Sequence, residues 1–198
     1  MQFSKKFELL LTIKEKLIQK LENILKILEL GNDKEKIKIL ETLDDTNNSE
    51  ILEQIISKLD DKNIQVRGEA FSSLVINKNQ ISNFLIKSLN SSNENIRGFT
   101  LLILANRNET NAIPEIIKLV KDKHSMVRSC AIGALGHLKA QEIKEIYPEV
   151  LLDSNIEVKK SMLQAIIDQQ IIISKNILKK IIKEKDPEVQ KLISKLKI

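Results

Sequence analysis

The sequence contains few of the residue types that non-helical folds require. Its 198 residues include no Trp, one Tyr and five Phe, so the hydrophobic core must be aliphatic. Gly (5) and Pro (3) are rare, which excludes a β-sandwich or barrel because those folds need many turn residues. The single cysteine, Cys130, excludes a disulfide framework and favours a reducing compartment.

Membrane and targeting segments are not apparent either. The apolar residues 9–13 are bounded by Glu8 and Lys14, and no small-residue cleavage site follows them. No stretch approaches the 18 or so apolar residues of a membrane span. We therefore expect a cytoplasmic protein that has no membrane partner.

The net charge of +5 is unevenly distributed. Residues 1–60 carry 10 basic and 12 acidic side chains, residues 61–125 carry 9 and 6, and residues 126–198 carry 13 and 9. A basic C-terminal end could meet nucleic acid, an anionic membrane or an acidic protein. The simpler interpretation is a solvated, lysine-rich helix surface.

A repeat of about 31 residues runs through the chain. Its most regular feature is an aliphatic anchor, found five times at spacings of 30, 31, 31 and 31 residues: Val66, Ile96, Val127, Val158 and Val189. We expect a degenerate earlier copy near Ile37. Each period predicts two amphipathic helices, and because one pair cannot bury both apolar faces, the pairs are expected to stack into a solenoid.

The predicted core positions follow from the anchors. In the first helix of a period they lie four and eight residues after the anchor: Ala70 and Leu74, Thr100 and Leu104, Ala131 and Leu135, Met162 and Ile166. In the second helix they lie eleven and seven residues before the next anchor: Ile55 and Leu59, Leu85 and Leu89, Ile116 and Val120, Tyr147 and Leu151, Leu178 and Ile182.

The sequence resembles HEAT-like repeat proteins, in particular the short class found in phycobilisome-lyase-type proteins. The resemblance covers roughly residues 32–198. Its matching pieces are Asp-x-x-x-x-Val-Arg-x-x-Ala at 61–70 and 122–131, Ala-Leu-Gly-x-Leu at 134–138 and Ala-Ile-Pro at 112–114. It implies architecture and leaves function open, because such repeats serve many roles.

The predicted fold is thus all-α, a right-handed α-solenoid (superhelix) of about five to six HEAT-like helical-hairpin repeats. We expect a single domain over 1–198, with an N-terminal capping helix over 1–30, repeats over 32–185 and a C-terminal half-repeat cap over 186–198. One apolar stripe marks residues 1–30: Leu10, Ile13, Leu17, Leu21, Ile24 and Leu28. A dimerising helix is the alternative for this segment.

A basic residue follows the anchor in four repeats, and an acid precedes three of these residues by six positions. The basic residues are Arg67, Arg97, Arg128 and Lys159, and the acids are Asp61, Asp122 and Asp153. In HEAT-like repeats such side chains bond between neighbouring repeats, so the resemblance implies a structural ladder. A phosphate-binding arginine row is the alternative.

A second polar row is expected on the second helices, which line the concave face in this family. Its contact candidates are Asn83, Lys87, Lys118, Glu145, Glu149 and Lys180. The mixed signs and the scarcity of aromatic residues suit a peptide or protein partner better than nucleic acid. A solvated face that binds no partner is the alternative.

Catalytic and metal-binding patterns are poorly supported. His124 and His137 lie thirteen residues apart, neither begins a His-Glu pair, and Cys130 is interpreted as a small core residue. We expect no catalytic residue, metal or cofactor, and hence no enzyme.

The predicted function is a protein–protein interaction module or adaptor, a scaffold that presents a concave polar surface. The second hypothesis is a nucleic-acid binder related to HEAT-like DNA-alkylation-repair proteins, and the third is a tetrapyrrole lyase or chaperone. The lack of Trp, with only Tyr147 and four Arg, counts against both. The sequence does not identify the partner.

Overall fold

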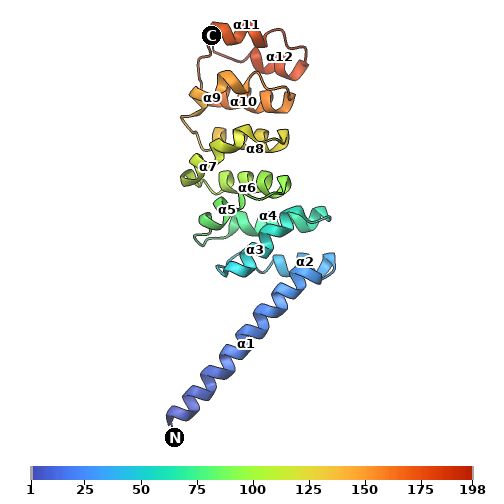
Figure 1. Ribbon diagram of the computed structural model, residues 1–198, viewed down its shortest axis with the longest axis vertical. Coiled ribbons are helices and arrows are strands. Elements are labelled where there is room, and N and C mark those ends of the chain that lie inside the picture. The colour runs from blue at the N-terminus through green and yellow to red at the C-terminus, as the bar shows by residue number, and fades with distance from the viewer. Residues whose placement is uncertain (1, 198) are drawn as a thin grey trace. The chain divides into compact units, whose positions relative to one another are not determined.

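The computed structural model describes residues 2–197, and every regular element in that range is helical (Figure 1). Met1 and Ile198, the outer ends of the two predicted caps, lie outside the described residues. The all-α repeat fold is therefore confirmed. The α-helices are α1 (Gln2–Leu30), α2 (Asp33–Leu40), α3 (Ser49–Ser57), α4 (Ile64–Ile76), α5 (Ser82–Ser88), α6 (Glu94–Asn106), α7 (Ile113–Lys118), α8 (Ser125–His137), α9 (Ile143–Val150), α10 (Ile156–Asp168), α11 (Lys175–Ile181) and α12 (Pro187–Ile193).

First and second helices alternate from α2 onward. The first helices α2, α4, α6, α8, α10 and α12 begin 30 or 31 residues apart, in agreement with the sequence period. The degenerate copy exists as α2. Its register is two residues earlier than predicted. The helix begins at Asp33, and the position 31 residues before the anchor Val66 is Glu35 rather than Ile37.

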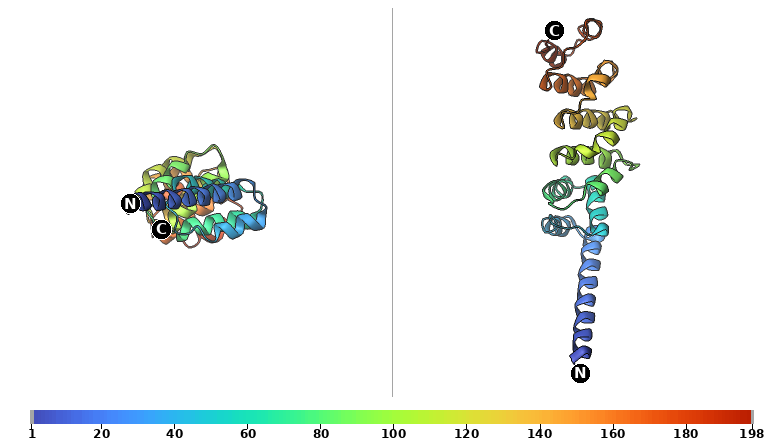
Figure 2. Two further views of the ribbon diagram at one scale, coloured as in Figure 1. Left: turned by 90° about the horizontal axis from the view of Figure 1, so that it is seen from below. Right: turned by 90° about the vertical axis from the view of Figure 1, so that its left-hand side faces the viewer.

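Contacts divide the chain into two compact units, Met1–Phe84 and Leu85–Ile198, with the boundary inside α5. In the first unit, the C-terminal part of α1 packs against α2 and α3 (Figures 1 and 2). In the second unit, α8 packs between α6 and α10, and α12 packs on α10. The organisation of 1–198 as one domain with two caps stays a prediction.

Asparagine caps four of the first helices, including Asn32 before α2. Asn63, Asn93 and Asn155 have extended backbone, and each side-chain oxygen accepts hydrogen bonds from the N–H groups two and three residues later. Asp186 does the same for α12, where Pro187 occupies the first turn and its missing N–H has no cost. The turns before these capped helices are therefore encoded locally, whereas His124 at the start of α8 makes no such side-chain bond.

Three first helices of the second unit also end in the same way, at a residue in the left-handed region. These residues lie 31 positions apart: Asn108 (φ 56°), Lys139 (φ 53°) and Gln170 (φ 55°). The next N–H donates back to the carbonyl five residues earlier, at 2.9–3.0 Å, in the pairs Glu109–Leu104, Ala140–Leu135 and Ile171–Ile166. This bond closes the helix and turns the chain toward the second helix.

The core positions of the first helices were predicted well. All eight residues four and eight after an anchor are buried, and so are four anchors. Ile96, the anchor next to the boundary between the units, is only half-buried.

The second helices follow the prediction up to α9 and then depart from it. Leu178 is half-buried and Ile182 is 55% exposed, so their assignment to the core was wrong. Ile177 and Ile181 are buried instead. The segment between the α11 core and the Val189 anchor is one residue longer than in the preceding repeats, which shifts the buried face of α11 by one position.

We expect α12 to stabilise the second unit through its buried face. Ile193 is buried, whereas Lys195, two residues later, is exposed. Ile193→Ala should lower the free energy of unfolding by about 2–3 kcal/mol, because it leaves a cavity at the end of the core. Lys195→Ala is the matched control and should change it by less than about 0.5 kcal/mol. Urea denaturation measures both, and equal effects would show that α12 is not packed as described.

Candidate functional site

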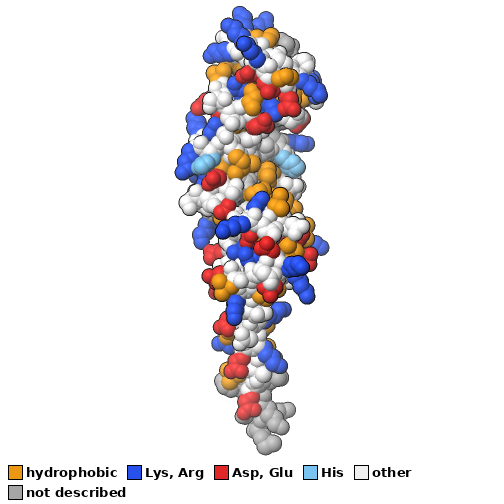
Figure 3. Space-filling view, turned by 90° about the vertical axis from the view of Figure 1, so that its right-hand side faces the viewer, with side chains coloured by type: hydrophobic (Ala, Val, Ile, Leu, Met, Phe, Trp, Pro, Cys, Tyr) orange, Lys and Arg blue, Asp and Glu red, His pale blue; other side chains and the backbone are white. Residues whose placement is uncertain are grey.

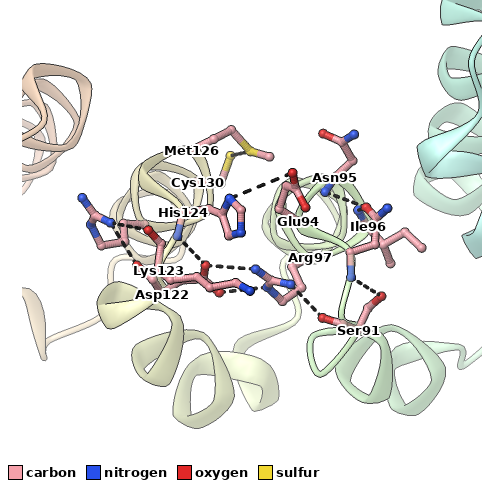
Figure 4. A network of polar contacts seen from close by, with 12 residues as sticks. Ser91, Glu94, Asn95, Ile96, Arg97, Asp122, Lys123, His124, Met126 and Cys130 are labelled. Atoms are coloured by element: carbon pink, nitrogen blue, oxygen red, sulfur yellow. Dashed lines mark hydrogen bonds and ion pairs between the residues drawn. The ribbon is translucent and has the colours of Figure 1, made fainter.

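Arg97 joins two repeats of the second unit (Figure 4). Its guanidinium donates to both carboxylate oxygens of Asp122, from Nε at 2.8 Å and from Nη2 at 3.0 Å. Nη1 donates to the backbone carbonyl of Ser91 in the loop of its own repeat, at 2.8 Å. Both charged side chains are buried, Arg97 at 6% exposure. The planar fork thus fixes the loop of one repeat and the carboxylate of the next at the same time.

The arrangement recurs at Arg128, and two lysines make simpler ion pairs with the same separation of 25 residues. Arg128 binds both oxygens of Asp153 at 2.7 and 2.8 Å and the carbonyl of Asp122 at 2.9 Å. Lys159 donates to Glu184 at 2.7 Å. In the first unit, Lys36 donates to Asp61 at 3.0 Å. We call these four ion pairs the ladder.

The carboxylates of the ladder are also held by their own loops. Asp61, Asp122 and Asp153 each accept a hydrogen bond from the N–H group two residues later, at 2.8–2.9 Å. Burial alone would raise the pKa of Asp122, but the hydrogen bonds from Arg97 and from the N–H of His124 outweigh it and lower the pKa. For Asp153, the hydrogen bond from Arg128 is the largest effect and lowers the pKa.

Two ladder members were missed by the sequence analysis. Lys36 and Glu184 complete the first and last pairs, and counting 31 residues back from Arg67 and 31 on from Asp153 locates them. Arg67 donates to the carbonyls of Asp61 and Lys62 at 2.8 and 3.3 Å. The acidic position of the following repeat is Ser91, which carries no charge.

The six contact candidates are all exposed. Asn83 and Lys87 lie on α5, Lys118 on α7, Glu145 and Glu149 on α9, and Lys180 on α11. Asn83 belongs to the first unit and the other five to the second. Together with Lys121, the second-unit members form a mixed-sign row that we call the second-helix row.

Lysines of the second-helix row form ion pairs at the surface. Lys118 donates to Glu115 at 2.6 Å, and Lys121 lies 3.1 Å from Glu149. Such pairs contribute little to stability, because water screens them. Their charges therefore remain accessible to a partner.

Furrows between successive repeats connect the row with the ladder. A furrow of about 360 Å³ between α7 and α9 has Lys121 and Glu149 among its lining residues together with the Arg128–Asp153 pair. A smaller furrow of about 110 Å³ beside α11 is lined by Leu152 and Lys180 and contains the Lys159–Glu184 pair. Apolar side chains such as Ile117, Ile146 and Val150 line the larger furrow as well.

The shifted register of α11 changes the place of one candidate. Lys118 and Glu149 each lie two residues before a buried core position, Val120 and Leu151. The corresponding residue before Ile181 is Lys179, which is exposed. Lys180 instead lies on the side of α11 that lines the furrow with Glu184.

Residues suited to catalysis do not gather at one place. Burial raises the pKa of the Cys130 thiol, which is half-buried rather than in the core as predicted, and its Sγ lies 3.7 Å from the Met126 sulfur. A thiol with a raised pKa stays protonated and is a poor nucleophile. His124 Nδ1 lies 4.0 Å from a Glu94 carboxylate oxygen (Figure 4), and His137 is exposed.

Within residues 2–197, no three His, Cys, Asp or Glu side chains are grouped so that they could hold a metal ion. In the same range, no helix is both long and apolar enough to cross a bilayer. Basic and acidic side chains are interspersed on the face shown in Figure 3. That face therefore differs from the uniformly basic surface typical of nucleic-acid-binding proteins.

Comparisons with known proteins agree with this architecture. Residues 82–167 match the sequence model of HEAT repeats. The Escherichia coli protein YibA is 17% identical with a TM-score of 0.62, over 87% of this chain and 67% of that chain. An engineered protein from a structural genomics consortium is 17% identical with a TM-score of 0.54, over 88% of this chain and 93% of that chain.

A designed armadillo repeat protein in complex with the peptide (KR)4 is 18% identical with a TM-score of 0.50, over 87% of this chain and 96% of that chain. No curated protein sequence matches the chain. At these identities the solved structures show the fold alone. The finer resemblance to phycobilisome-lyase-type repeats stays a prediction.

We expect the Arg97–Asp122 pair to stabilise the second unit in a pH-dependent way. Because the pKa of Asp122 is lowered in the folded state, its contribution is present above the unfolded pKa of about 4 and is lost as the pH falls through the folded pKa. Asp122→Asn should lower the free energy of unfolding by roughly 3 kcal/mol at pH 7, because Arg97 keeps its charge without a counterion. It should also flatten the loss of stability below pH 4.

Urea denaturation at pH 7 and pH 3 measures both effects. Glu115→Gln, which breaks the exposed pair with Lys118, is the control and should cost less than about 0.5 kcal/mol. The role of the ladder would be contradicted if Asp122→Asn lowered the free energy of unfolding as little as the control does and lost as much stability at pH 3 as the wild type.

Proposed function

Because this chain is a HEAT-like repeat protein, we propose that it is a non-enzymatic interaction module that binds an extended polypeptide along the second-helix row. The coarse part of this proposal agrees with the fold, which is also that of a designed peptide-binding armadillo repeat protein. The binding surface and the partner chemistry are inferred from the residues of the second unit.

The observation that carries the proposal is that the furrows contain two kinds of charged side chain, those that hold the repeats together and those exposed at the surface. Their interior charges, such as Arg128 and Asp153, are already paired and hydrogen-bonded. The charges at the surface, such as Lys121 and Glu149, are more than two-thirds exposed and only weakly committed to each other. A partner can therefore exchange the surface pairs for its own charges without disturbing the pairs that hold the repeats.

The order of charges defines the partner. From α7 onward, the row places Lys118 on α7 with Lys121 just after it, the acids Glu145 and Glu149 on α9, and Lys180 on α11. A complementary segment carries an acid, a base and an acid in that order. The packed first helices α6, α8 and α10 set a repeat spacing of about 8–10 Å, and an extended chain advances about 3.3 Å per residue, so these charges should recur about every third residue.

This pattern argues against nucleic acid as the ligand. A phosphate backbone is uniformly negative and would meet Glu145 and Glu149 in the middle of the row. The described second helices also offer no row of aromatic residues on which bases could stack. A protein segment with alternating charge avoids both problems.

The test is a fluorescence titration with a labelled peptide in which Glu, Lys and Glu are separated by two Ser residues each. The charge pattern is symmetric, so it fits in either chain direction. A peptide with Lys, Glu and Lys at the same positions should bind about tenfold more weakly. A single-stranded oligonucleotide should bind no more tightly than roughly 10 µM at physiological salt.

Charge reversal locates the surface. Glu145→Lys with Glu149→Lys should weaken the Glu-Lys-Glu peptide about tenfold and favour the opposite pattern. Glu157→Lys with Asp168→Lys changes the net charge equally on the first helix α10 and should leave binding unchanged. Equal affinity for both peptides, an effect of the α10 variant alone, or tighter binding of the oligonucleotide would overturn the proposal.

A further inference from the structure

Helix α1 has an apolar stripe of which only one end is covered. Leu10, Leu17, Leu21, Ile24 and Leu28 follow helical spacing and lie on one face. Ile24 and Leu28 are buried where α1 meets α2 and α3. Leu10 and Leu17 lie on the same face but are 57% and 62% exposed, because the N-terminal part of α1 runs past both helices (Figures 1 and 2).

Neighbouring side chains widen the exposed stripe into a patch. Leu11, Ile13 and Ile18 are large, apolar and exposed as well. Single exposed apolar residues are common on protein surfaces, whereas five within nine residues of one helix form a contiguous patch that is typical of an interface.

A groove continues this patch along the first repeat. It measures about 760 Å³ and lies between α1 and the segment from α2 to α3. Leu17, Ile18 and Leu21 line it on the side of α1, and Leu43 and Ile51 line it on the other side. A second helix packed against Leu10 and Leu17 would therefore contact a continuous apolar surface that extends to the segment from α2 to α3.

The distribution of charge along the chain indicates what covers the exposed patch. Residues 1–20 contain five Lys and two Glu, a net charge of +3. Residues 21–60, which include the rest of α1, α2 and α3, contain five Lys and ten Asp or Glu, a net charge of −5. The exposed patch thus lies within a basic segment that is followed by an acidic one, and the charges of the two segments complement each other.

We propose that α1 mediates self-association, and that the patch is covered by α1 of a second copy running antiparallel to the first. In this arrangement Leu10 of each copy meets Leu21 of the other, and the N-terminal half of each basic segment lies beside residues 21–30, where the acidic segment of its partner begins. A parallel pair would place the two +3 segments side by side, where they repel.

The first experiment measures mass by analytical ultracentrifugation of the full chain at about 50 µM. The wild type should sediment as a dimer, and Leu10→Ser with Leu17→Ser should sediment as a monomer. Because both side chains are exposed in the single chain, the double variant should keep its circular dichroism spectrum. Leu30→Ser is the control, since Leu30 is 73% exposed but lies on the opposite side of α1.

A monomeric wild type would overturn the proposal, and so would a double variant that stays dimeric or a control that dissociates equally. A wild type that is monomeric alone but takes up another protein through the patch would likewise refute a second copy as the occupant.

The second experiment tests orientation by disulfide cross-linking in a Cys130→Ser background. A chain with Leu10→Cys is mixed with a differently tagged chain with Leu21→Cys, and both are oxidised. The antiparallel arrangement predicts cross-links chiefly between unlike chains. Cross-links chiefly between two Leu10→Cys chains would show a parallel pair and contradict the charge argument.

Discussion

The repeats of this protein depend on a basic side chain that reaches a carboxylate 25 residues later. In the second unit, Arg97 and Arg128 each hold a carbonyl of their own loop and both carboxylate oxygens of the next repeat. Taking such charges out of water is costly unless nearly every donor and acceptor is satisfied. The carboxylates meet this requirement because the N–H group two residues later also binds them. The ladder therefore fixes the register of neighbouring repeats as well as their contact.

Satisfying the ladder internally leaves the surface above it available for binding. The furrow between α7 and α9 contains both the buried Arg128–Asp153 pair and the exposed Glu149. Substitutions of the buried pair should change stability, whereas substitutions of the exposed residues should change only the surface that the proposed partner would contact. Repeat proteins can evolve new partners in this way while they keep their architecture.

The sequence predicted most of the first-helix core, because those positions are counted forward from an anchor within one helix. Counting backward from Val189 across a loop failed at Leu178 and Ile182, since one additional residue in that segment rotates the buried face of α11 to Ile177 and Ile181. The apolar stripe of α1 was also recognised. Periodicity shows which side chains share an apolar face, but not which of them another helix covers. It therefore could not show that Ile24 is buried while Leu17 is exposed.

The central claim is that a partner binds on the second helices of residues 85–198 while the ladder beneath them stays intact. Amide hydrogen exchange with and without the Glu-Lys-Glu peptide tests it most directly, because it reports protection segment by segment. The account predicts slower exchange in 113–118, 143–150 and 175–181 on binding, with 125–137 and 156–168 unchanged. Protection confined to the first helices, or to α12, would contradict it.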